Sequence, residues 1–281
     1  MRIGKGSDPF GAVIAPIIAA LVAKTWGWQA AFIVTGGMGL IFAAVWYRTY
    51  RSPDIAGFVS AAELAEIRAG QRPVPVTATS MRAIVTTGRF WAIAVPRFLA
   101  EPAWQTFSFW VPLYFAKERG WDLTQIALFA WVPFLAADAG GILGGYMAPW
   151  LQRWRGFSLE GSRIAGIWIG AILMIAPGCV GLVASPYAAI ALLGIGGFAH
   201  QAISVLINTL SADVFPKNHI AKANGLVGMC GWTGGLLFSL LIGQFADTIG
   251  FAPLFACLGV FDLIGAIWLL ALRRHLTVAE A

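Results

Sequence analysis

The sequence predicts an all-α integral membrane protein with about eight transmembrane helices. Of its 281 residues, 59% are hydrophobic and only 11% are charged, and the mean hydropathy is +0.76. A soluble domain has roughly 45–50% apolar and about 25% charged residues. A bilayer core about 30 Å thick needs roughly 20 helical residues, and the apolar segments here are too long and uniform to be strands of a membrane barrel. Segments of the required length lie near residues 10–26, 28–47, 90–115, 123–149, 163–183, 187–211, 222–246 and 251–272.

Basic residues gather on alternate connections between these segments. The connections on one side are poor in basic residues and hold Lys24, Lys117 and Arg119. The rich side holds Arg2, Lys5, Arg48, Arg51, Arg68, Arg72, Arg82, Arg89, Arg153, Arg155, Arg163, Lys217, Lys222, Arg273 and Arg274. Because the positive-inside rule places the rich side in the cytoplasm, we predict a multi-pass protein of the cell's inner membrane with both termini cytoplasmic. The bilayer is its first partner, and the net charge of +6 reflects this bias rather than nucleic-acid binding.

A polar stretch at 48–89 separates two predicted spans from six that follow. Within it, residues 61–68 have the pattern of a short amphipathic helix, with Ser60 as N-cap and Glu63 three residues later. The stretch is either a central cytoplasmic linker between two bundles or an ordinary solvated loop.

Motifs for several other membrane functions do not occur in the sequence. There is no GxxxxGK[ST] stretch for ATP-driven transport. A membrane-embedded enzyme would need a constellation such as HExxH or GxSxG, and neither is present. Cys179, Cys230 and Cys257 lack CxxC spacing, so we expect no disulfide framework and no metal site. These absences speak against an ATP-driven transporter and a membrane-embedded enzyme, and we expect no catalytic residue, metal or cofactor.

Short stretches in a fixed order carry a family resemblance. They are GAVIAP at 11–16, WQAAFIVTG at 28–36, RTYRSP at 48–53, FWVPLY at 109–114, PFLAAD at 133–138, GFAHQ at 197–201 and DVFPK at 213–217. Together they resemble the anion:cation symporter family of the major facilitator superfamily, and most of all its hexuronate and aldonate branch. The resemblance covers nearly the whole chain.

The resemblance implies a twelve-helix fold of which this chain begins just before the fifth helix. Residues 1–47 would then be the last two helices of the N-terminal bundle, 48–89 the central cytoplasmic loop and 90–281 the complete C-terminal six-helix bundle. The chain is thus expected to be N-terminally truncated, and the missing helices to be needed for a complete transporter. In this family those helices carry charged residues for substrate binding and proton coupling.

The function implied by the resemblance is uptake of small organic anions, most specifically hexuronate or aldonate sugar acids. The driving cation is expected to be a proton, with Na⁺ as the alternative. Two other interpretations stay open: a truncated, non-transporting membrane remnant, and a major facilitator for another carboxylate. One departure from the family is visible at 144–153, where the usual Gly-x-x-x-Asp-Arg-x-Gly motif lacks its Asp, so the sequence does not predict the usual cytoplasmic gate contact.

Two opposite charges, Arg97 and Glu101, lie inside the predicted span 90–115. Ionised side chains within a span are costly and usually face a bundle interior or a water-filled cavity. A spacing of four residues places both on one helix face within mutual reach, and Gln105 extends this face. We expect Arg97 and Gln105 to bind substrate and Glu101 to couple the proton. The alternative is a structural pair. Pro102 frees a backbone carbonyl beside them, which predicts a kink.

Trp104 and Asp138 are candidates with opposing interpretations. The indole of Trp104 can pack on the C–H face of a sugar, although aromatic residues at lipid interfaces are common. Asp138 lies near the middle of its span and can carry a proton, or it can be a neutral, hydrogen-bonded structural acid. The glycines that follow it predict close helix packing; they are Gly140, Gly141, Gly144 and Gly145.

A second polar face lies on the predicted span 187–211. His200, Ser204 and Asn208 repeat every four residues, with Gln201 beside them, and in the resembled family this helix lines the cavity. We assign all four to substrate binding, against the alternative of satisfied structural groups.

Two further polar residues occur in the last two predicted spans. Asn224 is a substrate-binding candidate or merely a helix cap, and it precedes a glycine series that we interpret as a packing seam. Asp262 is interpreted as structural, because the last helix of this fold usually sits at the periphery.

Overall fold

The computed structural model describes residues 18, 21–23, 25–51, 55, 59–69, 80–216 and 218–276. The chain divides into one unit within Phe10–Val76 and another within Thr77–Ala281. Their boundary falls inside the predicted loop 48–89, and the three predicted domains with their limits stay predictions. Most of the predicted span 10–26 lies outside the described residues.

The first unit contains helices α2 (Trp28–Thr49) and α3 (Ala61–Ala69). None of the 22 residues of α2 is buried, although the helix is apolar on all sides, which is typical of a membrane span. The Ser60 hydroxyl accepts a hydrogen bond of 3.2 Å from the backbone N–H of Glu63, so the predicted N-cap of α3 is confirmed.

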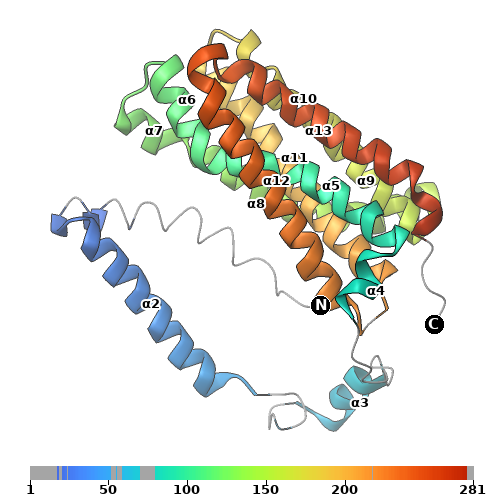
Figure 1. Ribbon diagram of the computed structural model, residues 1–281. Helices are drawn as coiled ribbons and strands as arrows, with labels where there is room; N and C mark the ends of the chain where they lie inside the picture. The colour runs from blue at the N-terminus through green and yellow to red at the C-terminus, as the bar shows by residue number, and fades with distance from the viewer. Residues whose placement is uncertain are drawn as a thin grey trace. The chain divides into compact units, whose positions relative to one another are not determined.

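The second unit is a bundle of long helices (Figure 1). Its first span combines α5 (Gly88–Gln105), the π-helical turn η1 (Thr106–Trp110) and α6 (Val111–Glu118). The remaining long elements are α8 (Val132–Arg155), α9 (Leu159–Leu173) continued by α10 (Ile175–Gly178) and η2 (Val180–Leu182), α11 (Pro186–Val214), α12 (Ile220–Ile249) and α13 (Phe251–Ala271). The short elements are α4 (Met81–Val85), α7 (Leu123–Phe129) and η3 (Arg273–His275).

The described elements are all helical, which confirms the predicted all-α membrane protein. Within the described residues, 5 helices are long and apolar enough to cross a membrane: Trp28–Thr49, Leu159–Leu182, Pro186–Val214, Ile220–Ile249 and Phe251–Ala271. The elements from α5 to α6, and α8, occupy the positions of two further predicted spans.

The predicted span 123–149 differs from the structure, where two helices replace one. Asp122 and Gln125 form a reciprocal capping box that starts the short helix α7. A proline, Pro133, then stands in the first turn of α8, a position where its missing N–H costs nothing. The long helix therefore begins later than predicted and continues to Arg155.

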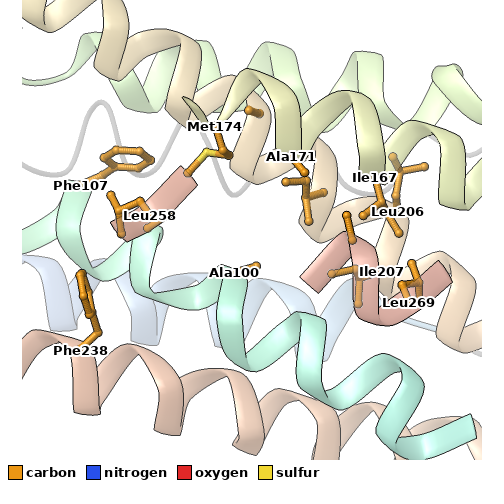
Figure 2. Packing of buried hydrophobic residues seen from close by; sticks show 14 of the residues in the cluster. Ala100, Phe107, Ile167, Ala171, Met174, Leu206, Ile207, Phe238, Leu258 and Leu269 are labelled. Atoms are coloured by element: carbon orange, nitrogen blue, oxygen red, sulfur yellow. The ribbon is translucent and has the colours of Figure 1, made fainter. Parts of the chain in front are cut away.

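The apolar core of the second unit lies where α5, α9, α11 and α13 meet (Figure 2). It includes Ala100, Phe107, Ile167, Ala171, Met174, Leu206, Ile207, Leu258 and Leu269. Its alanines allow the long helices to approach, while the larger side chains fill the space between them.

Glycines of α8 bring this helix into backbone contact with α11. A Cβ added at Gly140 of α8 would overlap the carbonyl oxygen of Phe198 in α11, and one added at Gly144 would lie 2.8 Å from the Cα of Ala202. The predicted close packing is therefore confirmed at these two positions. On α12 the seam is shorter than predicted, since Gly225 and Gly228 have no neighbour within 4 Å of an added Cβ.

Candidate functional site

The predicted polar face of α5 is buried in the bundle, and its two charges are paired. Arg97 Nη2 lies 2.8 Å from Glu101 Oε2, and the side chains are 14% and 3% exposed. Arg97 Nη1 donates a hydrogen bond of 2.6 Å to the Ser204 hydroxyl of α11. Two residues that were predicted on separate helices, Arg97 and Ser204, are thus in direct contact.

Glycines of α12 provide the space for this face. An added Cβ at Gly231 would lie 3.0 Å from Cγ of Arg97, and one at Gly235 would lie 2.6 Å from Cγ of Gln105 and 3.3 Å from Cγ of Glu101. Sequence reasoning missed this role, because a glycine repeat indicates close packing but not which side chains it accommodates.

Trp104 connects the polar face of α5 to the neighbouring helices. Its indole stacks on the His200 imidazole of α11, with ring centroids 5.7 Å apart and planes at 20°. It also meets Phe134 of α8 edge to face at 5.6 Å. His200 is 2% exposed, and its Nδ1 has no hydrogen-bond partner among the described residues. The contact with Phe134 was not predicted from the sequence.

Asp138 and Gln201 lie beside this group on the facing sides of α8 and α11. The Cγ of Gln201 is 3.3 Å from a Cβ added at Gly141. Phe134, Asp138 and Gly141 are spaced by four and three residues, so they share one face of α8. Asp138 is half-buried. On this face it lies between Phe134, which meets Trp104, and Gly141, which meets Gln201.

The remaining candidates lie outside the cluster. Asn208 is exposed, one turn beyond Ser204. Asn224 lies two turns before Gly231 on α12, which is about 10 Å along the helix axis. His219 is the N-cap of that helix, so Asn224 is not a cap. Its Oδ1 is buried without a hydrogen-bond partner among the described residues.

Backbone geometry just beyond the cluster departs from an ordinary α-helix. The Thr106 hydroxyl donates 2.8 Å to the carbonyl of Pro102, and the π-helical turn η1 follows immediately. Trp110, the last residue of that turn, donates 2.8 Å from Nε1 to the Ser239 hydroxyl of α12. This wide turn begins four residues after Pro102, and the kink predicted at Pro102 stays a prediction. Single π-turns of this kind are frequent at functional sites.

The cluster contains the Arg97–Glu101 ion pair, with hydroxyl, amide, imidazole and indole groups around it. Arg97 uses Nη2 for Glu101 and Nη1 for Ser204, whereas a guanidinium carries five N–H donors. Donors are thus left over for a further anion. Among the described residues, no group of three or more His, Cys, Asp or Glu side chains could hold a metal ion.

Solved structures with the same arrangement of helices are known at low sequence identity. A bacterial homologue of the iron transporter ferroportin, in its outward-facing state, aligns over 95% of this chain and 62% of its own, with TM-score 0.65 and 15% identity. A bacterial homologue of the human lysosomal transporter Spinster, in its inward-facing and occupied conformation, aligns over 94% of this chain and 65% of its own, with TM-score 0.57 and 14% identity. These likenesses concern the fold alone.

Curated relatives are closer in sequence. The hexuronate transporter of Escherichia coli K12 is 49% identical over 261 residues, which is 92% of this chain and 60% of the transporter. The galacturonate transporter of Dickeya chrysanthemi is 42% identical over 64% of this chain and 54% of its own. A D-galactonate transporter of Escherichia coli O6:H1 is 29% identical over 86% of this chain and 58% of its own. This chain therefore spans about 60% of the length of the relatives that it matches.

The family model of the Major Facilitator Superfamily matches residues 3–162, which is more than half of the 281 residues. Together with the apolar helices, this match confirms the resemblance found in the sequence motifs. The chain belongs to the Major Facilitator Superfamily.

Proposed function

We propose that this chain serves in the inner membrane as part of a secondary transporter for small sugar acids, hexuronates first, driven by proton symport. The observation that carries the proposal is the 49% identity to a hexuronate transporter over 92% of the chain. The polar cluster of α5 and α11 supplies groups that suit such a substrate, namely a guanidinium for the carboxylate and hydroxyl and amide groups for the sugar hydroxyls.

In this proposal Arg97 binds the substrate carboxylate. A guanidinium pairs with carboxylates through parallel N–H donors, and Arg97 lies in the middle of α5 with only 14% of its side chain exposed. Trp104 offers the ring face that does not stack on His200 to the apolar face of the sugar. Gln105 and Gln201 add amide donors and acceptors. Asn208 and Asn224 lie farther along their helices, so they would contact the substrate at a different depth in the membrane.

Glu101 couples the proton by competing with the substrate for Arg97. While Glu101 is charged, its ion pair with Arg97 is neutral, and a second carboxylate would add an uncompensated negative charge to a largely buried place. Burying such a charge is costly. Protonation of Glu101 leaves the guanidinium to the substrate, so one proton and one monoanion enter together. Asp138, on α8 beside this group, is the second candidate carrier of a proton.

The proposal is tested by uptake into proteoliposomes with two polypeptides. One is this 281-residue chain, and the other is a fusion in which the unmatched part of the E. coli hexuronate transporter precedes it, as the family resemblance places it. The substrates are labelled glucuronate, galacturonate and galactonate. Alternating access needs one repeat to move against another around a shared midplane site. We therefore expect the fusion to accumulate both hexuronates under an inward proton gradient, and this chain alone to insert without accumulating them.

Two variants of the fusion, one control and one test, accompany this assay. Lys117 and Asp247 form an exposed ion pair of 2.8 Å at the end of the bundle, so Lys117→Gln should leave uptake unchanged, whereas Arg97→Gln should abolish it. A correctly inserted fusion that accumulates none of the three acids would refute sugar-acid transport. Accumulation of galactonate alone would favour a different carboxylate, and accumulation driven only by a Na⁺ gradient would refute proton coupling.

A further inference from the structure

A groove of about 590 Å³ lies at the end of the bundle where α8 stops and α9 begins. Its walls are the last turns of α8, the first turns of α9, the end of α13 and the following turn η3. None of its lining residues belongs to the polar cluster of α5 and α11. The groove is therefore a second feature, separate from the proposed substrate site.

The mouth of the groove is positively charged. Arg155 and Arg273 are the charged residues in its lining. Arg155 is exposed and has no ion-pair or hydrogen-bond partner among the described residues. Arg273 is 55% exposed on its side chain and uses Nε for a 3.1 Å contact with Glu160, which leaves its terminal nitrogens open. Two guanidinium groups thus line this groove, and one of them is paired with a neighbouring acid.

The rest of the groove is apolar and follows helices that are built to cross the membrane. Ala165, Trp168 and Ile169 of α9 and Leu270 of α13 line it, and both helices are long and apolar enough to span a bilayer. From 161 to 169 the lining extends about 12 Å along α9, at 1.5 Å per residue. An occupant would therefore place an anionic group at the arginines and an apolar chain along α9.

We propose that this groove binds an anionic glycerophospholipid, whose phosphate lies between Arg155 and Arg273 and whose acyl chain packs along Ala165, Ile169 and Leu270. Basic pockets between transmembrane helices at the basic side of a membrane protein suit anionic headgroups. A volume of about 590 Å³ is within the range of ordinary ligand sites.

A free phosphate would use only part of this site. It could contact the two guanidinium groups, but it would leave the apolar wall of Trp168 and Ile169 uncovered, and it would gain nothing from burial of apolar surface. A zwitterionic lipid would cover that wall but bring its own positive charge toward the arginines. Only an anionic lipid satisfies both halves of the groove.

Four variants of the 281-residue chain, two in the lining of the groove and two controls beside it, test this proposal. The chain is purified in detergent and titrated with phosphatidylglycerol, phosphatidylcholine and inorganic phosphate, with lipid adducts counted by native mass spectrometry and melting temperature followed in parallel. The test variants are Arg155→Gln and the pair Arg155→Gln/Arg273→Gln. The matched controls are Arg153→Gln and the pair Arg153→Gln/Arg274→Gln, which make the same charge changes beside the groove rather than in its lining.

We expect the intact chain to bind phosphatidylglycerol in preference to phosphatidylcholine and to melt at a higher temperature with it. Arg155→Gln should weaken this binding about fivefold and the Arg155/Arg273 pair about thirtyfold, whereas both controls should stay within about twofold. Arg155→Gln keeps the Glu160–Arg273 ion pair, so its effect cannot arise from loss of that contact.

The apolar half of the groove is tested by filling or altering it with the arginines intact. In Ala165→Trp the new indole would fill the space proposed for the acyl chain. Ile169→Ser, at a residue 38% exposed, is a milder change that keeps the fold. Both should weaken binding of phosphatidylglycerol without changing the response to salt. Equal losses in test and control arginine variants would overturn the proposal in favour of diffuse charge attraction. Stabilisation by inorganic phosphate equal to that by the lipid would overturn it in favour of a free-anion site.

Discussion

Gly234 of α12 packs directly against the backbone carbonyl oxygen of Phe98 in α5. In an ordinary helix this oxygen accepts a hydrogen bond from the N–H of residue 102, but that residue is Pro102 and has no N–H. The carbonyl oxygen of Phe98 thus lacks its helical donor because residue 102 is proline, and it can approach α12 closely because Gly234 has no side chain. This contact holds α12 against the helix that carries Arg97 and Glu101.

Gly234→Ala should therefore destabilise the bundle. The added Cβ would overlap the Phe98 carbonyl, and relieving that overlap would move α12 away from α5, at a cost of about 1–3 kcal/mol in the free energy of unfolding. The measurement is the thermal melting of the chain in detergent. Gly228→Ala is the control on the same helix, because nothing lies within 4 Å of its added Cβ. Equal melting temperatures for the two variants would contradict the packing role of Gly234.

Glu101→Gln, made in the fusion protein, should impair coupled accumulation more than substrate binding. The amide keeps the shape of the side chain and can still accept a hydrogen bond from Arg97, but it cannot take up a proton. We expect accumulation under a proton gradient to fall by about tenfold or more, while exchange of labelled for unlabelled hexuronate changes by about twofold at most. Undiminished proton-driven accumulation by this variant would remove Glu101 from the coupling role.

Asp262→Asn should leave accumulation unchanged in the same assay. Asp262 is 5% exposed and lies on the face of α13 between Gly259, which meets Met174, and Gly265, which meets Pro96. This face is packed into the bundle, and among the described residues Asp262 makes no hydrogen bond or ion pair with the group around Arg97. A loss of accumulation comparable to that of Glu101→Gln would show that Asp262 carries a coupled proton.

The predicted topology is tested by cysteine labelling with a membrane-impermeant reagent. In a background without Cys179, Cys230 and Cys257, new cysteines at Pro75 and Ser185 should react from opposite sides of the membrane. The charge asymmetry of the loops places the first position in the cytoplasm. Labelling of both positions from one side would refute the predicted orientation.

The sequence predicted the polar face of α5 because its signal is local. Arg97, Glu101 and Gln105 recur every four residues in an apolar segment, and that period alone places them on one side of a helix. The contacts that complete the group join residues far apart in the chain. Neither the hydrogen bond from Arg97 to Ser204 nor the stacking of Trp104 on His200 follows from the spacing within either helix.

The boundaries of the helices show a similar limit. The division of the predicted span 123–149 into α7 and α8 depends on two local features, the capping box of Asp122 and the position of Pro133. Both are visible in the sequence, but the continuous hydropathy across them outweighed them in the prediction. The glycines of α12 were predicted to pack closely, yet the structure separates Gly231 and Gly235, which accommodate the polar face, from Gly225, which faces open space.

The π-helical turn at Thr106–Trp110 makes this segment tolerant of a change in length that the regular helices on either side of it would not tolerate. Such a turn holds one residue more than an α-helical turn, so deletion of a single residue here would restore regular hydrogen bonding and leave α6 in its present rotational phase. In that phase Trp110 reaches Ser239, and Glu118 accepts a hydrogen bond of 2.8 Å from the backbone N–H of Phe251. A one-residue insertion or deletion within α6 would instead rotate everything beyond it by about 100° and would turn Glu118 away from Phe251.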